Sequence, residues 1–318
     1  MLRISIVSIF LLIFFSCPGQ NKIQQDTTNF NKTFIKVTLL GTGTPQPVMA
    51  RFSASILVQA GGKNFLFDAG RGCLLRLRQI QVENNMIDAV FFTHLHSDHI
   101  VGFPDFWLSG WLESHRKVPL KVFGPKGTKQ MTDYLQKAYQ FDIGIREEDD
   151  KASPEGIKTL TTDIAEGTVY EEGGLKIIAF LVDHYPVVPA LGYRIEFGGH
   201  SVVLSGDTRY STNLIKFAKG TDLLVHEVAI ASDTLKKTDP RYNILMHHTT
   251  PEQASKVFAT VQPKLAVYSH IVTIYHYPID EILKRTKEYY SGPVILGEDL
   301  MSFSVGETVT MKTWDKKK

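Results

Sequence analysis

The stretch FFTHLHSDHI, at residues 91–100, constrains this chain more than any other. It places His94, His96, Asp98 and His99 within six positions, directly behind an apolar run. The chain of 318 residues has only 11 histidines, so this concentration calls for a chemical explanation. Imidazole and carboxylate groups are the ligands that borderline divalent metals, zinc first among them, take in proteins. The cluster therefore predicts a metal site.

The spacing within the cluster suggests two metal ions. In an extended segment, residues two apart point the same way, so His94 and His96 can share one ion. Asp98 and His99, where the chain turns, can reach a second ion. Four residues cannot fill two coordination spheres, so further ligands must come from elsewhere in the chain.

Five apolar runs along the chain end at a histidine or an acidic residue. Sites in open α/β sheets form at the carboxyl ends of strands, because the loops there converge. The runs are DAVFFT before His94, KIIAFLVD before His184, HSVVLSG before Asp207, DLLV before His226 and Glu227, and KLAVYS before His270. We therefore expect strands that end at these residues, with His184, Asp207 and His270 as the obvious suppliers of the remaining ligands.

Helical patterns alternate with the apolar runs, which is typical of an α/β protein. They predict helices over residues 72–82, 127–140, 211–219, 251–262 and 279–290. The turn GTGTPQP lacks the lysine of a phosphate-binding loop, so we expect it to follow the first strand and border the active site. GGH, at 198–200, predicts a hairpin turn. Phe106, Trp107 and Trp111 could either wall a substrate cleft or belong to the core.

The N-terminus predicts export. MLRISIVSIFLLIFFSC, residues 1–17, has one arginine and then an apolar run too short to span a bilayer. A small residue before Cys17 resembles a bacterial lipoprotein signal, which would anchor the chain to a membrane through that cysteine. Phe14 replaces the usual leucine, so plain secretion or an uncleaved anchor stays open. We expect a polar tether over 18–33, the folded domain that carries the metal site over 34–312, and a location in the cell envelope or periplasm.

The HxHxDH cluster, with its outlying ligands in this order, resembles the metallo-β-lactamase superfamily. Further motifs match the branch that contains ribonuclease Z and a group of arylsulfatases. They are VTLLGTGTPQP (37–47), FLFDAGRG (65–72), GYRIE (192–196), VVLSGDT (202–208), HHTTPEQA (247–254) and YSH (268–270). The resemblance implies an α/β (α+β) fold of the αββα sandwich type, with two facing mixed sheets and helices outside.

The resemblance also implies two Zn²⁺ per chain and a division of the ligands between them. His94, His96 and His184 would hold one zinc ion, Asp98, His99 and His270 the other, and Asp207 would bridge the two. A hydroxide shared by both ions would attack the ester substrate. Asp68 would accept the free N–H of a ligand histidine and fix its ring.

The same resemblance assigns a proton donor. His248 would protonate the departing oxygen, with Glu227 holding its ring in place. The adjacent His247 is an alternative, and a purely structural His–Glu contact would also account for the pair.

The substrate is inferred from what the chain lacks. Ribonuclease Z enzymes of the short type carry a long arm that grips transfer RNA, whereas only Phe197 to Leu204 separate the flanking motifs here. The net charge of +2 and the export signal also argue against a nucleic acid substrate. We therefore expect an arylsulfatase-like hydrolase of small sulfate or phosphate esters.

The alternatives are a ribonuclease Z-type transfer RNA 3′-processing endonuclease, a β-lactam hydrolase, or a non-catalytic metal-binding envelope protein. The oligomeric state stays open, a homodimer included.

Overall fold

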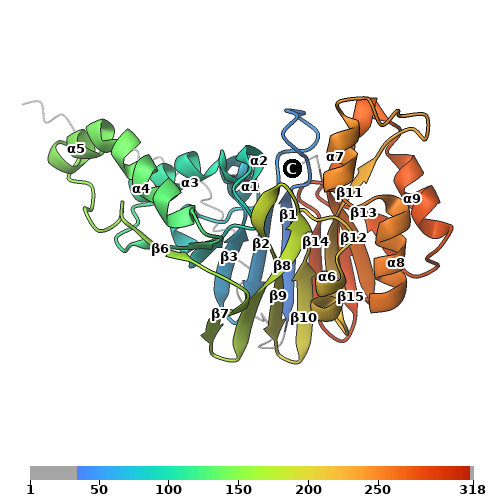
Figure 1. Ribbon diagram of the computed structural model, residues 1–318. Helices are drawn as coiled ribbons and strands as arrows, with labels where there is room; N and C mark the ends of the chain where they lie inside the picture. Colours follow the sequence, from blue (N-terminus) through green and yellow to red (C-terminus); the bar gives the residue numbers. More distant parts are fainter. Residues whose placement is uncertain (1–33, 316–318) are drawn as a thin grey trace, which may run out of the picture. The chain divides into compact units, whose positions relative to one another are not determined.

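Strands rich in Val, Ile and Phe form two sheets (Figure 1). The structure is a computed structural model and describes residues 34–315, so the expected signal and tether lie outside the described residues. The first sheet has the strand order β15-β14-β1-β2-β3-β4-β5-β6. Its strands are β1 (Ile35–Gly41), β2 (Ser55–Ala60), β3 (Lys63–Phe67), β4 (Ala89–Phe91), β5 (Leu120–Gly124), β6 (Thr159–Asp163), β14 (Ser302–Val305) and β15 (Val309–Lys312).

The second sheet has the order β13-β12-β11-β10-β9-β8-β7. Its strands are β7 (Gly167–Glu172), β8 (Leu175–His184), β9 (Val187–Phe197), β10 (His200–Leu204), β11 (Leu223–Ile230), β12 (Leu265–Thr273) and β13 (Val294–Leu296). Strands β10, β11 and β12 are parallel, and β8 runs in the same direction because both β8 and β10 are antiparallel to β9. The carboxyl ends of these four strands therefore meet at one edge, where a site can form.

A buried apolar cluster holds the two sheets face to face. Val37, Phe67 and Phe91 from the first sheet pack with Ile177 and Tyr193 from the second. Alternation along each strand sends the intervening residues to the outer faces. Each sheet therefore has a second apolar face that must be covered.

Helices cover both outer faces. Leu77 and Trp107, from α1 and α3, pack on the first sheet, whereas Leu214 and Phe258, from α6 and α8, pack on the second. The helices are α1 (Cys73–Gln79), α2 (Ser97–Ile100), α3 (Phe103–Leu112), α4 (Thr128–Ala138), α5 (Gln140–Glu148), α6 (Thr212–Ala218), α7 (Tyr242–His247), α8 (Pro251–Val261) and α9 (Asp280–Lys287). The expected α/β fold with an αββα arrangement is confirmed (Figure 1).

The five predicted helices correspond to α1, α4, α6, α8 and α9, each within a few residues of its predicted ends. Helix α8 begins at a capping box in which Thr250 and Gln253 bond each other's backbone N–H, as the sequence around Pro251 suggests. None of the helices in residues 34–315 is long and apolar enough to cross a membrane.

The aromatic residues after the metal cluster belong to the core. Phe106 and Trp107 are fully buried in α3, and Trp107 Nε1 donates a hydrogen bond to the backbone oxygen of Ile157, 2.7 Å away. Trp111 is buried in the same way and bonds Ser153 O. The alternative in which these side chains wall a cleft is therefore wrong.

Two strands run on where the sequence suggested that they end. Strand β11 continues past His226 to Ile230, and β12 continues past His270 to Thr273. The GGH turn does join β9 to β10 directly, with Gly198 and Gly199 at positive φ. No arm is inserted between these two strands.

Candidate metal centre and active-site cleft

The HLHSDH segment changes conformation in its middle. His96 is extended (φ −64°, ψ 148°) and caps the N-terminus of α2, whereas Asp98 and His99 lie on the helix itself. Residues 92–96 follow β4 without regular structure. This change from extended chain to helix separates the first two histidines from Asp98 and His99, as the spacing predicts.

His270 reaches the site through a β-bulge. Glu227 pairs with Ser269 and Val228 with Ile271, so His270 is an extra residue in β12. Its φ of +44° is unusual for a residue with a side chain. A bulge of this kind re-aims one side chain without ending the strand.

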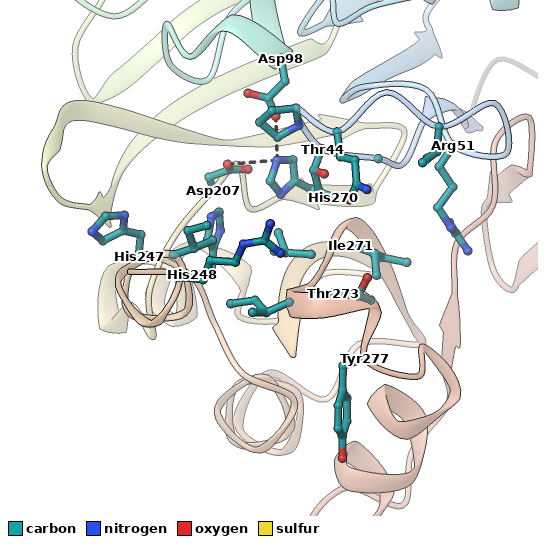
Figure 2. A pocket seen from close by; sticks show the side chains of 18 of the residues that line it. Thr44, Arg51, Asp98, Asp207, His247, His248, His270, Ile271, Thr273 and Tyr277 are labelled. Atoms are coloured by element: carbon teal, nitrogen blue, oxygen red, sulfur yellow. Dashed lines mark hydrogen bonds and ion pairs between the residues drawn. The ribbon is translucent and has the colours of Figure 1, made fainter. Parts of the chain in front are cut away.

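Asp207 lies at the centre of the cluster. Its Oδ2 atom is 3.8 Å from His94 Nε2, 3.8 Å from His184 Nε2, 3.5 Å from His99 Nε2 and 3.3 Å from His270 Nε2. Three of the same histidines have a second close neighbour. His270 Nε2 lies 3.1 Å and His99 Nε2 3.6 Å from Asp98 Oδ2, and His184 Nε2 lies 3.3 Å from His96 Nδ1. The other six predicted ligands therefore gather around the carboxylate of Asp207 (Figure 2 shows Asp98, Asp207 and His270).

The seven residues fall into two groups of the size that a metal ion needs. One group is His94, His96, His184 and Asp207, and the other is Asp98, His99 and His270; within each group the ligand atoms lie within 4.8 Å of one another. His94 Nε2, His99 Nε2 and Asp207 Oδ1 are buried and have no hydrogen-bond partner. Such atoms are costly unless something satisfies them. This donor set fits divalent metal ions.

Burial and charge set the protonation of the cluster. Burial lowers the pKa of His94 and His184, which favours the neutral imidazole that metals bind. Burial alone would raise the pKa of Asp207, but His270 and His99 outweigh it and hold that pKa well below its usual range. The carboxylate is therefore ionised.

Asp68 fixes the ring of His99. Its Oδ2 atom lies 2.8 Å from His99 Nδ1, and its Oδ1 accepts a 2.8 Å hydrogen bond from Thr93 N. A carboxylate in this position orients a ligand histidine and leaves its other nitrogen for a metal. This contact is the one that the resemblance implied.

His248 and Glu227 form a buried pair beside the cluster. His248 Nδ1 lies 3.3 Å from Glu227 Oε2, and Glu227 Oε1 accepts a 2.8 Å hydrogen bond from Thr249 N. Burial would lower the pKa of His248, but Glu227 raises it to about 9. His247 is placed differently, because its backbone oxygen lies 3.0 Å from His184 Nδ1. The ring that Glu227 holds is thus that of His248.

A cleft of about 830 Å³ opens beside the cluster. One wall is the loop 43–51, which contains Thr44 and Arg51 and confirms that GTGTPQP borders the site (Figure 2). The other wall is formed by α7, with the preceding Arg241, and by residues 271–274 and 276–279. A cleft of this volume accommodates far more than a single phosphate or sulfate group.

One buried carboxylate, not predicted from the sequence, holds both ends of the loop 43–51. Asp299 Oδ1 accepts hydrogen bonds from Thr42 N (2.9 Å) and Thr42 Oγ1 (2.8 Å), and its Oδ2 accepts from Phe52 N (2.8 Å). Arg76 Nη2 donates to the same Oδ2 at 2.8 Å. Asp299 therefore holds the loop at its two ends and makes no hydrogen bond to the residues between them.

The comparisons with known proteins agree with this fold. The family model described as the β-lactamase superfamily domain matches residues 63–271. Ribonuclease Z from Mycolicibacterium gilvum is 35% identical over 285 residues, which are 87% of this chain and 99% of that protein. The match runs almost from end to end of the relative.

Solved structures show the same fold. The metallo-β-lactamase fold protein YhfI from Bacillus subtilis has a TM-score of 0.67 and 21% identity, covering 86% of this chain and all of its own. The short form of human tRNase Z has a TM-score of 0.63 and 21% identity, covering 84% of this chain and 98% of its own.

These relatives correct the expected substrate. The expectation of an arylsulfatase-like activity on small sulfate or phosphate esters, with nucleic acid as an unlikely partner, is wrong, because the relatives matched along almost their whole length are named ribonuclease Z. The net charge of +2 was a poor guide, since it averages acidic and basic surfaces. The distribution of charge around a cleft matters more, and this cleft is lined by Arg51 and Arg241.

The site binds metal, and the protein is a metal-dependent hydrolase that acts on ester bonds. The fold, the donor set and the end-to-end match lead to one assignment. The chain belongs to the β-lactamase superfamily, within its ribonuclease Z branch.

Proposed function

We propose that the protein is a ribonuclease Z-type endonuclease that hydrolyses a phosphodiester bond in RNA, with precursor transfer RNA as its first candidate substrate. The observation that carries this proposal is the position of Asp207, whose carboxylate faces both ligand groups beside a cleft of about 830 Å³. The identity of 35% to a ribonuclease Z along its whole length supports it.

Two zinc ions are the proposed cofactors. His94, His96 and His184 would hold one, Asp98, His99 and His270 the other, and Asp207 would contact both; nitrogen and oxygen donors of this kind suit zinc. When bound, the ions would supply Lewis acidity at the scissile phosphate.

The surrounding residues have distinct proposed roles. His248 would hold a proton on its ring and give it to the departing oxygen, and Glu227 would keep that ring charged and oriented. Its placement supports this role, because the ligand atoms of His248, Asp207 and His270 lie within 4.8 Å of one another. Asp68 would orient His99.

A cleavage assay tests the proposal. Zinc-loaded protein is incubated with a precursor transfer RNA carrying a 3′ trailer, and the cut is mapped. We expect one cut at the trailer, abolished in Asp207→Asn and retained in Asp133→Asn, an exposed acidic residue paired with Lys129 on α4. Zinc-loaded protein that leaves the precursor intact would refute the activity.

The export of the protein is a separate proposal. It is supported by the apolar run before Cys17 and is independent of the site. Cell fractionation and the mass of the mature chain test it. A soluble cytoplasmic chain that retains Met1 would rule it out.

A further inference from the structure

Arg241 lines the cleft with its guanidinium unpaired. Within residues 34–315 its side chain has neither a hydrogen bond nor an ion pair, and it lies over the ring of Tyr275, whose centroid is 4.3 Å from Arg241 Cζ. An arginine that stacks on an aromatic ring uses the face of its planar guanidinium, and the N–H donors at the edge of that group stay exposed. Those donors remain available to a ligand.

Asp239 positions this pair. Its Oδ1 accepts a 2.8 Å hydrogen bond from the backbone N–H of Arg241, and its two oxygens accept from Tyr275 Oη at 3.2 and 3.0 Å. The carboxylate thereby ties the segment before α7 to the segment after β12. Its hydrogen bonds go to the backbone and to the tyrosine, so the guanidinium is left without an anionic partner.

The backbone beneath Tyr275 is held in an unusual conformation. Tyr275 (φ 54°, ψ 38°) and His276 (φ 54°) are consecutive non-glycine residues in the left-handed region. That region is costly for residues with a side chain, and such cost concentrates where a side chain must be aimed. Tyr275 is nevertheless 56% exposed, so burial of its ring does not account for the conformation.

The chemistry of this wall suits a nucleotide chain. Next to Arg241 it presents the apolar side chains of Ile244, Ile271 and Ile274. RNA carries an anionic phosphate and a flat base in every nucleotide. A guanidinium can donate two parallel N–H bonds to two oxygens of one phosphate. The scissile phosphate belongs at the cluster around Asp207. Within residues 34–315 no hydrogen bond or ion pair joins the Arg241 side chain to that cluster, so its guanidinium is available to a second phosphate in the same cleft.

We propose that Arg241, held flat by Tyr275, binds a phosphate of the RNA next to the scissile one, and that this contact makes the enzyme select polynucleotides over simple phosphodiesters. Tyr275 is a positioning residue that acts through Arg241. The inference rests on the proposed function and adds a specificity-determining contact to it.

The test compares two substrates in Arg241→Gln. Precursor transfer RNA has neighbouring phosphates, whereas bis(p-nitrophenyl) phosphate has a single phosphodiester and no neighbour. We expect the KM for RNA to rise about tenfold, as loss of one charge-assisted contact implies, with kcat changed less than twofold. The KM for the nitrophenyl diester should rise several-fold less. The salt dependence of RNA binding should lose about one unit of slope.

Companion variants separate position from charge. Tyr275→Phe keeps the ring and loses the bond to Asp239, so it should raise the KM for RNA less than Tyr275→Ala. Arg78→Gln, an exposed arginine paired with Glu83 outside the cleft, serves as the matched control and should change neither substrate. Zinc content measured for each variant shows that the site is intact.

The outcomes distinguish this inference from the proposed function. Equal KM changes on both substrates in Arg241→Gln, or no change on RNA, overturn the phosphate contact while leaving the ribonuclease activity in place. A Tyr275→Ala variant that matches the wild type overturns the positioning role. Wild-type protein that hydrolyses the nitrophenyl diester and leaves RNA intact overturns the proposed function and this inference with it.

Discussion

His226 and His270 lie on neighbouring parallel strands, and each follows an apolar run of the same kind, yet they face opposite sides of the sheet. His226 stays in register opposite Tyr268, is buried, and packs against Phe258 of α8 at a centroid distance of 5.7 Å. His270 is the bulged residue and points to Asp207, 3.3 Å away.

The difference shows that a bulge, rather than residue type, selects the metal ligand. Regular alternation would place His270 on the same face as Tyr268, under the outer helices. The extra residue in β12 turns the His270 side chain to the other side of the sheet. At Ile271, which pairs with Val228, the side chain again points to the side that the outer helices cover.

His270→Ala should break the site. Loss of this donor leaves Asp98 and His99 as an incomplete group, and the hydrolysis rate should fall on the order of 10³-fold, since a catalytic metal is worth several kcal/mol. Zinc content and turnover of bis(p-nitrophenyl) phosphate measure the effect. His270→Ala with full zinc content and normal turnover would show that the bulge does not serve metal binding.

His248→Ala should reduce kcat on RNA about 100-fold without changing zinc content, because a proton donor is lost. This residue pairs with Glu227, the immediate neighbour of His226. A nitrophenolate leaving group needs little protonation, so turnover of bis(p-nitrophenyl) phosphate should fall much less. Equal losses on both substrates would count against a proton-donor role.

Asp68→Asn should weaken metal binding about 10- to 100-fold, the usual cost of removing the partner of a ligand histidine. The variant keeps the size of the side chain but no longer anchors His99 Nδ1 as a carboxylate. Competition with a zinc chelator measures the affinity. Unchanged affinity would mean that the ring of His99 is fixed by other contacts.

His226→Leu should have the smallest effect. The ring loses its contact with the backbone oxygen of Glu227, 2.6 Å from His226 Nδ1, which is worth about 1 kcal/mol of unfolding free energy. Urea denaturation measures this change, and zinc content and turnover should match those of the wild type. A loss of zinc in this variant would contradict the assignment of His226 to the outer face.

The sequence predicts which residues form the metal cluster, but it does not predict how the backbone brings each of them to the site. Few residue types can bind zinc, and their spacing in HLHSDH limits the geometry, so the gathering of these side chains could be anticipated. The bulge at His270 could not, because the run from Leu265 to Thr273 contains no glycine or proline to mark it. Strand β12 therefore looked as though it ended at the histidine.

The same reasoning explains the other omissions. Helix α3 was missed because FPDFWLSGWL carries apolar residues on most of its faces, which hides the helical period. Asp299 and Arg241 lie in turns, and Tyr275 lies in a 3-10 helix of three residues (Ile274–His276), and in such short segments periodicity carries no signal. The net charge and the short hairpin predict the wrong substrate, because neither describes the residues that line the cleft.

The anchoring of Thr42 and Phe52 to the single carboxylate of Asp299 has a consequence for how such enzymes diversify. With both stems fastened to one point of the scaffold, the intervening tip can change in length or chemistry without disturbing the frame that carries it. Exchange of residues 44–50 between relatives is therefore a practical route to hybrid enzymes that differ in substrate selectivity and keep the same metal-binding residues.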